Sequence, residues 1–246
     1  MFRHQGKNRT LKHNLQIASL LSLVAGIVNV VGFLAVNRLT TNVTGHFAYL
    51  IDSVFKLDFW NGFVFFLYIF FFFIGSFVSS FLVEFVGRKN ANSIYIFPVI
   101  LEIIILFLIP YLDYFFISEH TNVIACSLLF AMGLQNSLVT KISNAMVRTT
   151  HLTGLFTDLG IEISQLFFYK ETVKRAKLLS SIKLRFTIIG FFFTGGLFGG
   201  YFYQKIELYV LIIAGFILIL GLLFDNIKLK LLLLNRKLRV VHSVFS

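Results

Sequence analysis

The sequence predicts an all-α membrane protein with six transmembrane helices, arranged as two inverted three-helix repeats. Its composition is the first reason, because 57% of the residues are hydrophobic and 13% are charged, unlike a soluble domain. The second is the length of its apolar runs, since a helix crosses a bilayer with about 20 apolar residues. The runs are continuous rather than alternating, which excludes a transmembrane β-barrel. The third is an internal repeat.

The repeat centres on a six-residue phrase. Residues 40–45 read TTNVTG (the first phrase) and residues 149–154 read TTHLTG (the second phrase). The match extends to AGIVN at 25–29 against MGLQN at 132–136, and to FFFIGS at 71–76 against FFFTGG at 191–196. The offset between the copies grows from 107 to 109 to 120 residues along these anchors. A repeat of this length defines the architecture, so repeat one is placed at residues 15–113 and repeat two at residues 122–225.

The predicted spans give the chain its orientation. They lie near residues 15–36, 59–85, 93–112, 122–140, 186–204 and 207–224. With a cytoplasmic N-terminus, all of the 22 Lys and Arg except Arg38, Lys56 and Lys205 fall on the cytoplasmic side. Basic residues concentrate on that side of the membrane, so both termini are expected in the cytoplasm of a bacterial inner membrane. The first span is too long for the apolar part of a cleaved signal peptide.

The segments outside the spans carry most of the charge. They are the basic N-terminus at residues 1–14, a basic cytoplasmic loop at 141–185, and a basic tail at 226–246. Anionic lipid headgroups are the expected partner of such flanking charge. A nucleic-acid partner is not expected, because the charge is divided among short segments beside the spans. The single cysteine, Cys126, excludes an internal disulfide and a cysteine-based metal cluster.

Three spans per repeat would make the second copy enter the membrane from the opposite side. Inverted repeats of this kind are found in many secondary transporters, with the solute site between the halves. The alternative is that duplication only built a stable six-helix bundle. If the repeats are inverted, the two phrases lie on opposite faces of the membrane.

Each phrase is followed by an amphipathic segment, expected as a short helix over residues 46–55 and 155–169. Thr44 and Thr153 are expected to cap these helices, and Gly45 and Gly154 to allow close approach of a ligand or backbone. The helices either re-enter the membrane, with their amide ends facing one central site, or lie flat at the two interfaces. His46, beside the first phrase, is a further candidate for that site.

Several acidic residues lie in or near the predicted spans, where a charged side chain is expected to have a basic or polar partner. Glu102 lies in mid-span without a basic neighbour, and an ionisable group at that depth is a functional candidate. Glu84 is expected to pair with Arg88 four residues on. Asp158, Glu162 and Gln165 share one helical face; a solvated face paired with Lys174, Arg175 or Lys177 is expected, and a cation site is the alternative.

Small and amide residues within the spans complete the candidate positions. Asn29 and Asn136 correspond under the repeat, and with Gln135 they either join helices or line a hydrated cavity. Small residues at four-residue spacing suggest that the helices at 59–85 and 186–204 pack closely on each other. These residues are Gly75, Ser79, Gly195, Gly196, Gly199 and Gly200.

The two phrases, with the MGLQN segment and the run at residues 26–33, resemble the YoaK-type family of bacterial integral membrane proteins. The resemblance covers nearly the whole chain and implies a six-span inner-membrane protein of unknown function. Members of that family often carry Asn where this chain has His46, so a ligand contact at that position would differ here.

The leading functional prediction is a small secondary carrier or channel for a solute or ion. Its expected site holds Glu102, the amides Asn29, Gln135 and Asn136, and the helix starts of the two phrases: Thr44, Gly45, His46, Thr153 and Gly154. No cofactor or metal is expected, and no catalytic motif is visible. A membrane scaffold that pairs with itself or another protein is the alternative. An intramembrane hydrolase using a hydroxyl residue with His151 is a third option.

Overall fold

The computed structural model describes residues 9–87, 95–116 and 121–224, which are helical and contain no strand. In order, the helices are α1 (Leu11–Val36), α2 (Val43–Phe55), α3 (Phe59–Gly87), α4 (Ile96–Phe116), α5 (Thr121–Ser143), α6 (Leu152–Phe168) and α7 (Thr172–Ile206). A short 3-10 helix, η2 (Glu207–Tyr209), follows α7, and residues 210–224 are again helical. The basic tail at 226–246 and Arg88 lie outside the described residues.

Four helices of the described chain are long and apolar enough to cross a bilayer: α1, α3, α5 and the segment Thr172–Phe224. A shorter apolar helix, Ile96–Leu112, lies within α4. The last segment runs through η2, where Glu207 has a φ of 47°. The chain is therefore an all-helical, multi-pass membrane protein, and its division into six spans stays a prediction.

Helices α1 and α5 form the centre of the molecule. In each, 61% of the most apolar 18-residue window is buried, against 22% in α3. α1 packs mainly on α7, and α5 packs mainly on α3 and α4. Each repeat therefore completes its core with a helix of the other repeat.

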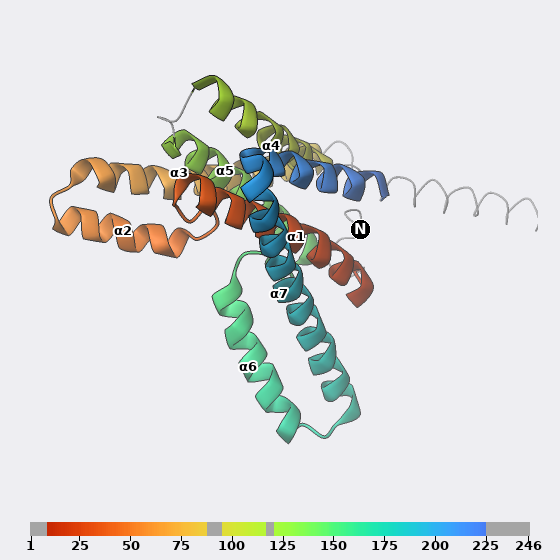
Figure 1. Ribbon diagram of the computed structural model, residues 1–246. Helices are drawn as coiled ribbons and strands as arrows, with labels where there is room; N and C mark the ends of the chain where they lie inside the picture. The colour runs from red at the N-terminus through yellow and green to blue at the C-terminus, as the bar shows by residue number, and fades with distance from the viewer. Residues whose placement is uncertain (1–8, 88–94, 117–120, 225–246) are drawn as a thin grey trace, which may run out of the picture.

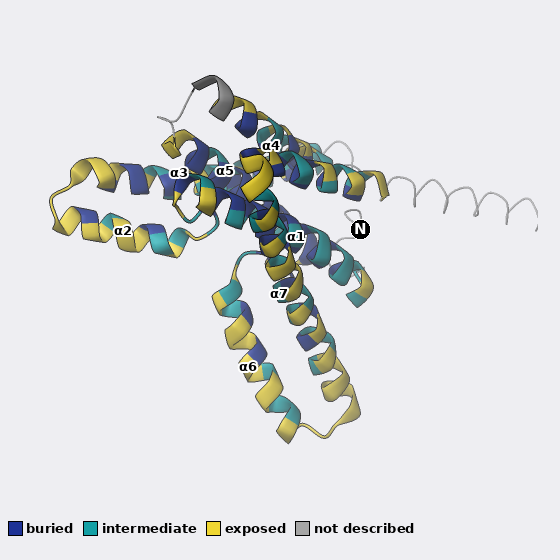
Figure 2. Cartoon of the chain, in the orientation of Figure 1, coloured by how far each residue is buried: buried dark blue, intermediate teal, exposed yellow. Residues whose placement is uncertain are grey.

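Two helical hairpins extend from this centre as arms (Figure 1). α2 folds back on the first part of α3, and α6 folds back on the first part of α7. Exposed residues run along both arms (Figure 2). The basic segment expected as a loop at residues 141–185 thus holds the end of α5, all of α6 and the start of α7.

Glycines allow the central helices to touch through their backbones. A Cβ on Gly26 would overlap the carbonyl oxygen of Phe192, and one on Gly133 would overlap the carbonyl oxygen of Phe72. Gly195 lies in the same way against Leu23 of α1. Such contacts need glycine because the approaching group is backbone, which cannot move aside.

The prediction that α3 and α7 pack through their small residues on each other is wrong. Gly75 of α3 lies against Phe130 of α5. On α7, the nearest groups to Gly195, Gly196, Gly199 and Gly200 all belong to α1, and Ser79 of α3 is fully buried. The spacing identified the close-packing faces, but it carries no information on which helix each face meets.

Candidate functional site

Each repeat ties its phrase to an asparagine in the preceding helix. The Thr41 hydroxyl donates to Oδ1 of Asn29 at 2.5 Å, and the Thr150 hydroxyl donates to Oδ1 of Asn136 at 2.9 Å. The asparagines are offset by 107 residues and the threonines by 109, as in the sequence alignment. The same hydrogen bond therefore forms at both corresponding positions.

Gln135 extends this polar cluster into the centre of the molecule. Its side chain is fully buried, and its Nε2 donates to the carbonyl oxygen of Leu21 at 2.8 Å and to the Thr149 hydroxyl at 3.3 Å. Its Oε1 has no hydrogen-bond partner within the described chain. In repeat one the corresponding Thr40 donates to the carbonyl oxygen of Val28 at 3.4 Å. Buried acceptors are usually satisfied, so the free Oε1 is a point where a polar solute or water could bind.

The short helices begin three residues earlier than expected, and threonine caps neither of them. Asn42 caps α2, because its Oδ1 accepts from the backbone N–H of Gly45 at 3.1 Å. Thr44 and Thr153 lie exposed in the first turns of α2 and α6. His151 holds the cap position of α6 without a side-chain cap, and its ring lies where a Cβ on Gly154 would be.

His46 lies buried within the first arm. Its Nε2 lies 2.6 Å from the carbonyl oxygen of Leu39, so Nε2 carries the proton and donates it. The ring packs edge-on against Tyr68, with ring centres 5.0 Å apart. Burial lowers the pKa of His46, and the nearby charge of Arg38 adds to this, while the Leu39 hydrogen bond opposes it. His46 is therefore neutral near pH 7, and it links α2 to Leu39, the residue before the first phrase, and to Tyr68 of α3.

Glu102 stands apart from the other candidates. It is fully buried in α4, and neither carboxylate oxygen has a hydrogen-bond partner within the described residues. No hydrogen bond in the described chain joins its carboxylate to either phrase. The structure thus leaves the predicted residues in separate groups: one around each phrase, and Glu102.

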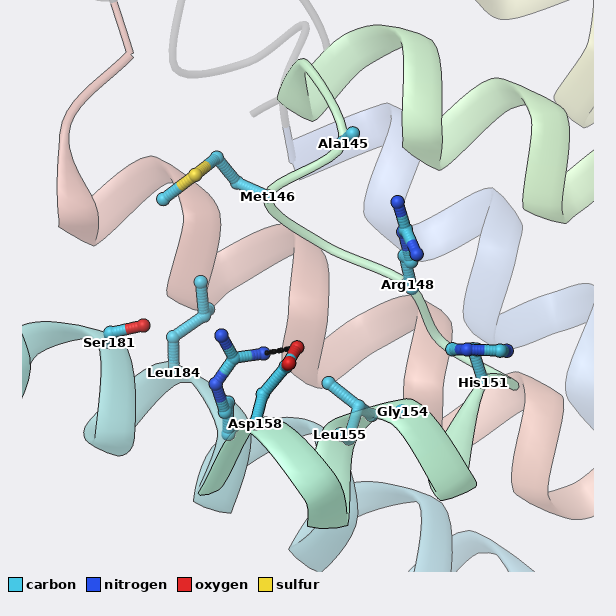
Figure 3. A pocket seen from close by; sticks show the side chains of 10 residues that line it. Ala145, Met146, Arg148, His151, Gly154, Leu155, Asp158, Ser181 and Leu184 are labelled. Atoms are coloured by element: carbon cyan, nitrogen blue, oxygen red, sulfur yellow. Dashed lines mark ion pairs between the residues drawn. The ribbon is translucent and has the colours of Figure 1, made fainter. Parts of the chain in front are cut away.

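A cavity of about 280 Å³ opens beside the second phrase, between α6, α7 and the segment after α5 (Figure 3). Its walls include Arg148, His151 and Gly154 on one side and Ser181 and Arg185 on the other. Of these, only Gly154 was predicted from the sequence to belong to the site. Nothing in the sequence pointed to Arg185, because only the fold of the α6 to α7 hairpin brings it next to Asp158.

The ion pairs of the second arm differ from the prediction. Arg185, rather than Lys174, Arg175 or Lys177, binds both acidic residues of α6: its Nη1 lies 2.9 Å from Asp158, and its Nε lies 2.8 Å from Glu162. The Ser181 hydroxyl also donates to Glu162, at 2.6 Å. Burial raises the pKa of Glu162, but its hydrogen bonds from Arg185 and Ser181 and the charge of Arg185 together lower it further, so the pKa lies below its usual value.

Lys174 instead pairs with Glu171 near the start of α7. Glu84 pairs across helices with Lys141 of α5, 2.5 Å away. Neither pair was predicted from the sequence, and Arg88, the predicted partner of Glu84, lies outside the described residues. Within the described residues, no group of three or more His, Cys, Asp or Glu side chains is arranged to hold a metal ion.

Comparison with known proteins gives the chain a family. Residues 17–224 match the model of a family described as "Protein of unknown function (DUF1275)". The chain belongs to this family. A relative in Bacillus subtilis (strain 168), the UPF0700 transmembrane protein YoaK, is 29% identical over 164 residues, which are 64% of this chain and 71% of the relative. No solved structure matches the chain. The resemblance inferred from the two phrases is thereby confirmed, and this DUF1275 member is a transmembrane protein of a family without an assigned activity.

Proposed function

We propose that this chain is a small secondary carrier or channel-like protein, built as two inverted repeats with a solute pathway between them. Its termini would lie in the cytoplasm of a bacterial inner membrane, where its basic segments meet anionic lipid headgroups. The corresponding phrases would then mark the two ends of the pathway. Three features of the structure support the proposal.

The first feature is that the two repeats make the same contacts. The threonine-to-asparagine hydrogen bond recurs in both. So does the close backbone approach, because Gly26 against Phe192 corresponds to Gly133 against Phe72. Both α1 and α5 are also followed by an asparagine with positive φ, Asn37 and Asn144. A pseudo-twofold axis relating the halves would generate all three pairs at once.

The second feature is the exchange of helices between repeats. α1 packs on α7, and α5 packs on α3. Carriers with inverted repeats place their sites at such an interface between halves, where one half can move against the other. The buried Gln135 lies at this interface, since it bonds to α1 and to the second phrase.

The third feature, which carries the transport proposal, is Glu102. A charged side chain in the middle of a membrane costs about 2.5 to 3.5 kcal/mol on insertion scales, and a purely structural glutamate would be expected to find a partner. Glu102 is fully buried with both oxygens unpartnered in the described chain. It is therefore suited to exchange a proton or to meet a polar solute.

Side-specific thiol labelling tests this proposal. With Cys126 replaced by alanine, Thr44→Cys should react with an impermeant reagent from outside and Thr153→Cys from the cytoplasm, since both positions are exposed. Glu102→Cys should react through water, whereas Leu106→Cys should stay protected. Leu106 is the matched control because it is fully buried one turn further along α4. Labelling of Thr44→Cys and Thr153→Cys from one side would refute the inverted repeat, and a sealed Glu102→Cys would refute the pathway.

A membrane scaffold is the second candidate, and one observation favours it. The tip of the second arm exposes large apolar side chains, with Phe167 79% and Phe168 81% exposed. The scaffold alternative predicts that the Phe167→Ser/Phe168→Ser variant loses self-association in detergent, as judged by light scattering of the purified protein. A carrier that functions as a monomer predicts no change.

A further inference from the structure

The buried polar atoms of this protein are unbalanced in one direction. Among the described residues, the buried side-chain nitrogen and oxygen atoms without a hydrogen-bond partner belong to Gln16, Ser22, His46, Ser79, Glu102 and Gln135. All of these atoms can accept a hydrogen bond, because they are amide, carboxylate or hydroxyl oxygens and the Nδ1 of His46, whose proton lies on Nε2. No side-chain N–H donor is among them. The interior therefore lacks donors rather than acceptors.

Two of these acceptors lie beside each other where α1 meets α5. The Gln135 amide nitrogen of α5 donates to the carbonyl oxygen of Leu21 at 2.8 Å, which fixes the amide oxygen as the free end of that side chain. Ser22 follows Leu21 in α1, and its hydroxyl is fully buried without a partner. The free oxygens of Gln135 and Ser22 are thus at the same depth in the bundle.

Ser79 of α3 lies at a similar depth. It is placed between two other serines that contact α5. The Ser76 hydroxyl donates to the carbonyl oxygen of Gly133 at 3.2 Å. The Ser80 hydroxyl accepts from Lys141 at 3.1 Å. Ser79 is therefore level with the part of α5 between these contacts, which carries the free amide oxygen, and its own hydroxyl is fully buried.

Glu102 of α4 reaches this depth as well. The Tyr95 hydroxyl, just before α4, interacts electrostatically with Glu84, which pairs with Lys141 near the end of α5. Glu102 is seven residues further along α4, and Gln135 is six residues back along α5, which are about 10 Å and about 9 Å at the rise of a helix. Because α4 packs mainly on α5, the carboxylate and the amide lie at corresponding depths of neighbouring helices.

No basic side chain compensates the charge of Glu102. α3 and α5 both pack on α4, and each has a single charged residue: Glu84 and Lys141, which pair with each other. Residues 207–224 add only a further acid, Glu207. The remaining titratable side chains of these elements are two phenols and a thiol, none of which can become positive: Tyr68, Tyr209 and Cys126. An ionised carboxylate without a partner is costly at such a depth, so a proton or a bound cation neutralises it.

We infer that this level of the bundle binds a monovalent cation, which is an alkali ion or a protonated amine. The Glu102 carboxylate would balance its charge, and the free oxygens of Gln135, Ser22 and Ser79 would accept its hydrogen bonds or coordinate it. One proton leaves Glu102 for each cation that binds, so the charge of the site stays constant. The inference rests on the proposed carrier function and adds its substrate class.

The same observations argue against other solutes. An anion would meet one carboxylate and several acceptors, with no free donor among the described buried side chains. A divalent cation would leave one charge uncompensated, because the described residues hold no cluster of acidic or histidine side chains. One carboxylate and neutral oxygens match a single positive charge.

Proton release from the purified protein in detergent tests the site without requiring transport. In weak buffer, sodium, potassium or methylammonium chloride should release up to one proton per protein, in a saturable way, as read by a pH indicator. The salt that saturates at the lowest concentration distinguishes an alkali ion from an amine. Tetraethylammonium chloride is the control for ionic strength, because its cation is bulky and has no N–H group.

Matched variants assign the release to the site. Glu102→Gln should abolish it, whereas Glu84→Gln makes the same change at a glutamate that already pairs with Lys141 and should leave it unchanged. Ser79→Ala should raise the half-saturating concentration by about three- to tenfold, the effect of one lost hydrogen bond. Ser76→Ala should not, because that hydroxyl is already bonded to α5. The two serine variants provide the second measurement if Glu102→Gln does not fold.

Release that persists in Glu102→Gln would overturn the inference. So would the absence of release with all three salts, or an equal response to tetraethylammonium chloride. These outcomes are separate from failure of the carrier proposal, which shows as labelling of Thr44→Cys and Thr153→Cys from one side or as a sealed Glu102→Cys. A protein that fails there and still releases protons binds the cation without transporting it.

Discussion

At the scale of single residues, this protein places polar groups where a membrane interior makes them costly, and it satisfies some of them but not others. Asn29 and Asn136 each accept a hydrogen bond from a threonine hydroxyl. Oε1 of Gln135 and both oxygens of Glu102 have no partner in the described chain. The satisfied groups hold the phrases in place, and the unsatisfied ones are the groups on which the proposed carrier function depends.

Removal of the asparagine in repeat two should weaken the fold only modestly. Hydrogen bonds between membrane helices contribute about 0.6 kcal/mol on average and up to about 1.7. A double-mutant cycle of Asn136→Leu and Thr150→Val should therefore give a coupling energy of about 1 kcal/mol in unfolding experiments in mixed micelles. The corresponding cycle of Asn29→Leu and Thr41→Val should give a similar value, and a coupling near zero in both would show that these contacts do not position the phrases.

His46 should make the first arm sensitive to acid. Because burial lowers its pKa in the folded state, the unfolded chain binds a proton more readily, and stability falls as the pH drops through the ordinary histidine value of about 6.5. The thermal midpoint in detergent should decrease between about pH 7.5 and about pH 5.5. His46→Leu, which introduces the residue found at this position in repeat two, should reduce that dependence. An unchanged pH profile in the variant would contradict the assignment.

At the scale of helices, glycine contacts set how closely the central pairs pack. Gly26→Ala and Gly133→Ala should each destabilise the fold by about 1 to 3 kcal/mol, because the added methyl group meets a backbone carbonyl on the facing helix. Gly160→Ala and Gly190→Ala are the controls, since nothing lies within 4 Å of the added group. These should be neutral or stabilising, by up to about 1 kcal/mol, through helix propensity. Thermal unfolding of the four variants in one detergent distinguishes the two groups.

The second arm should depend on pH through a different residue. The lowered pKa of Glu162 means that its contribution is present above the ordinary glutamate value and is lost as the pH falls through the lower, folded value. The α6 to α7 hairpin should therefore be cleaved faster by an acid-active protease at low pH. Glu162→Gln should make cleavage nearly independent of pH over that range. If the variant behaves like the unchanged chain, the Glu162 to Arg185 ion pair does not hold α6 to α7.

At the scale of the whole molecule, each repeat depends on the other for its core. α1 packs on α7 of the other repeat, and α3 packs on α5. A chain ending at residue 118 should consequently fail to accumulate in membranes when it is expressed alone. Co-expression with a chain that begins at residue 119 should restore both halves to the membrane fraction, as followed by immunoblotting. Independent accumulation of either half would show that the exchanged packing is dispensable.

The sequence by itself determined the helical membrane class, the family and the repeated pattern of residues. Its long apolar runs predicted a multi-pass helical membrane protein, because only helices and closed β-barrels satisfy the backbone in lipid, and barrel strands alternate apolar with polar residues. The two phrases predicted the family, and they also aligned Asn29 with Asn136 before any contact was known. These features are encoded locally, in composition and in order along the chain.

Only the tertiary structure decided which faces meet. Gly75 and Gly195 look like a pair in sequence, yet they pack on α5 and α1. Arg185 lies 23 residues from Glu162, and Lys141 lies 57 residues from Glu84, and neither of these partners was predicted from the sequence. The physical reason is that the small or charged residues on one helix face determine what kind of contact the face can make, but not with which helix. That depends on how all the helices pack together.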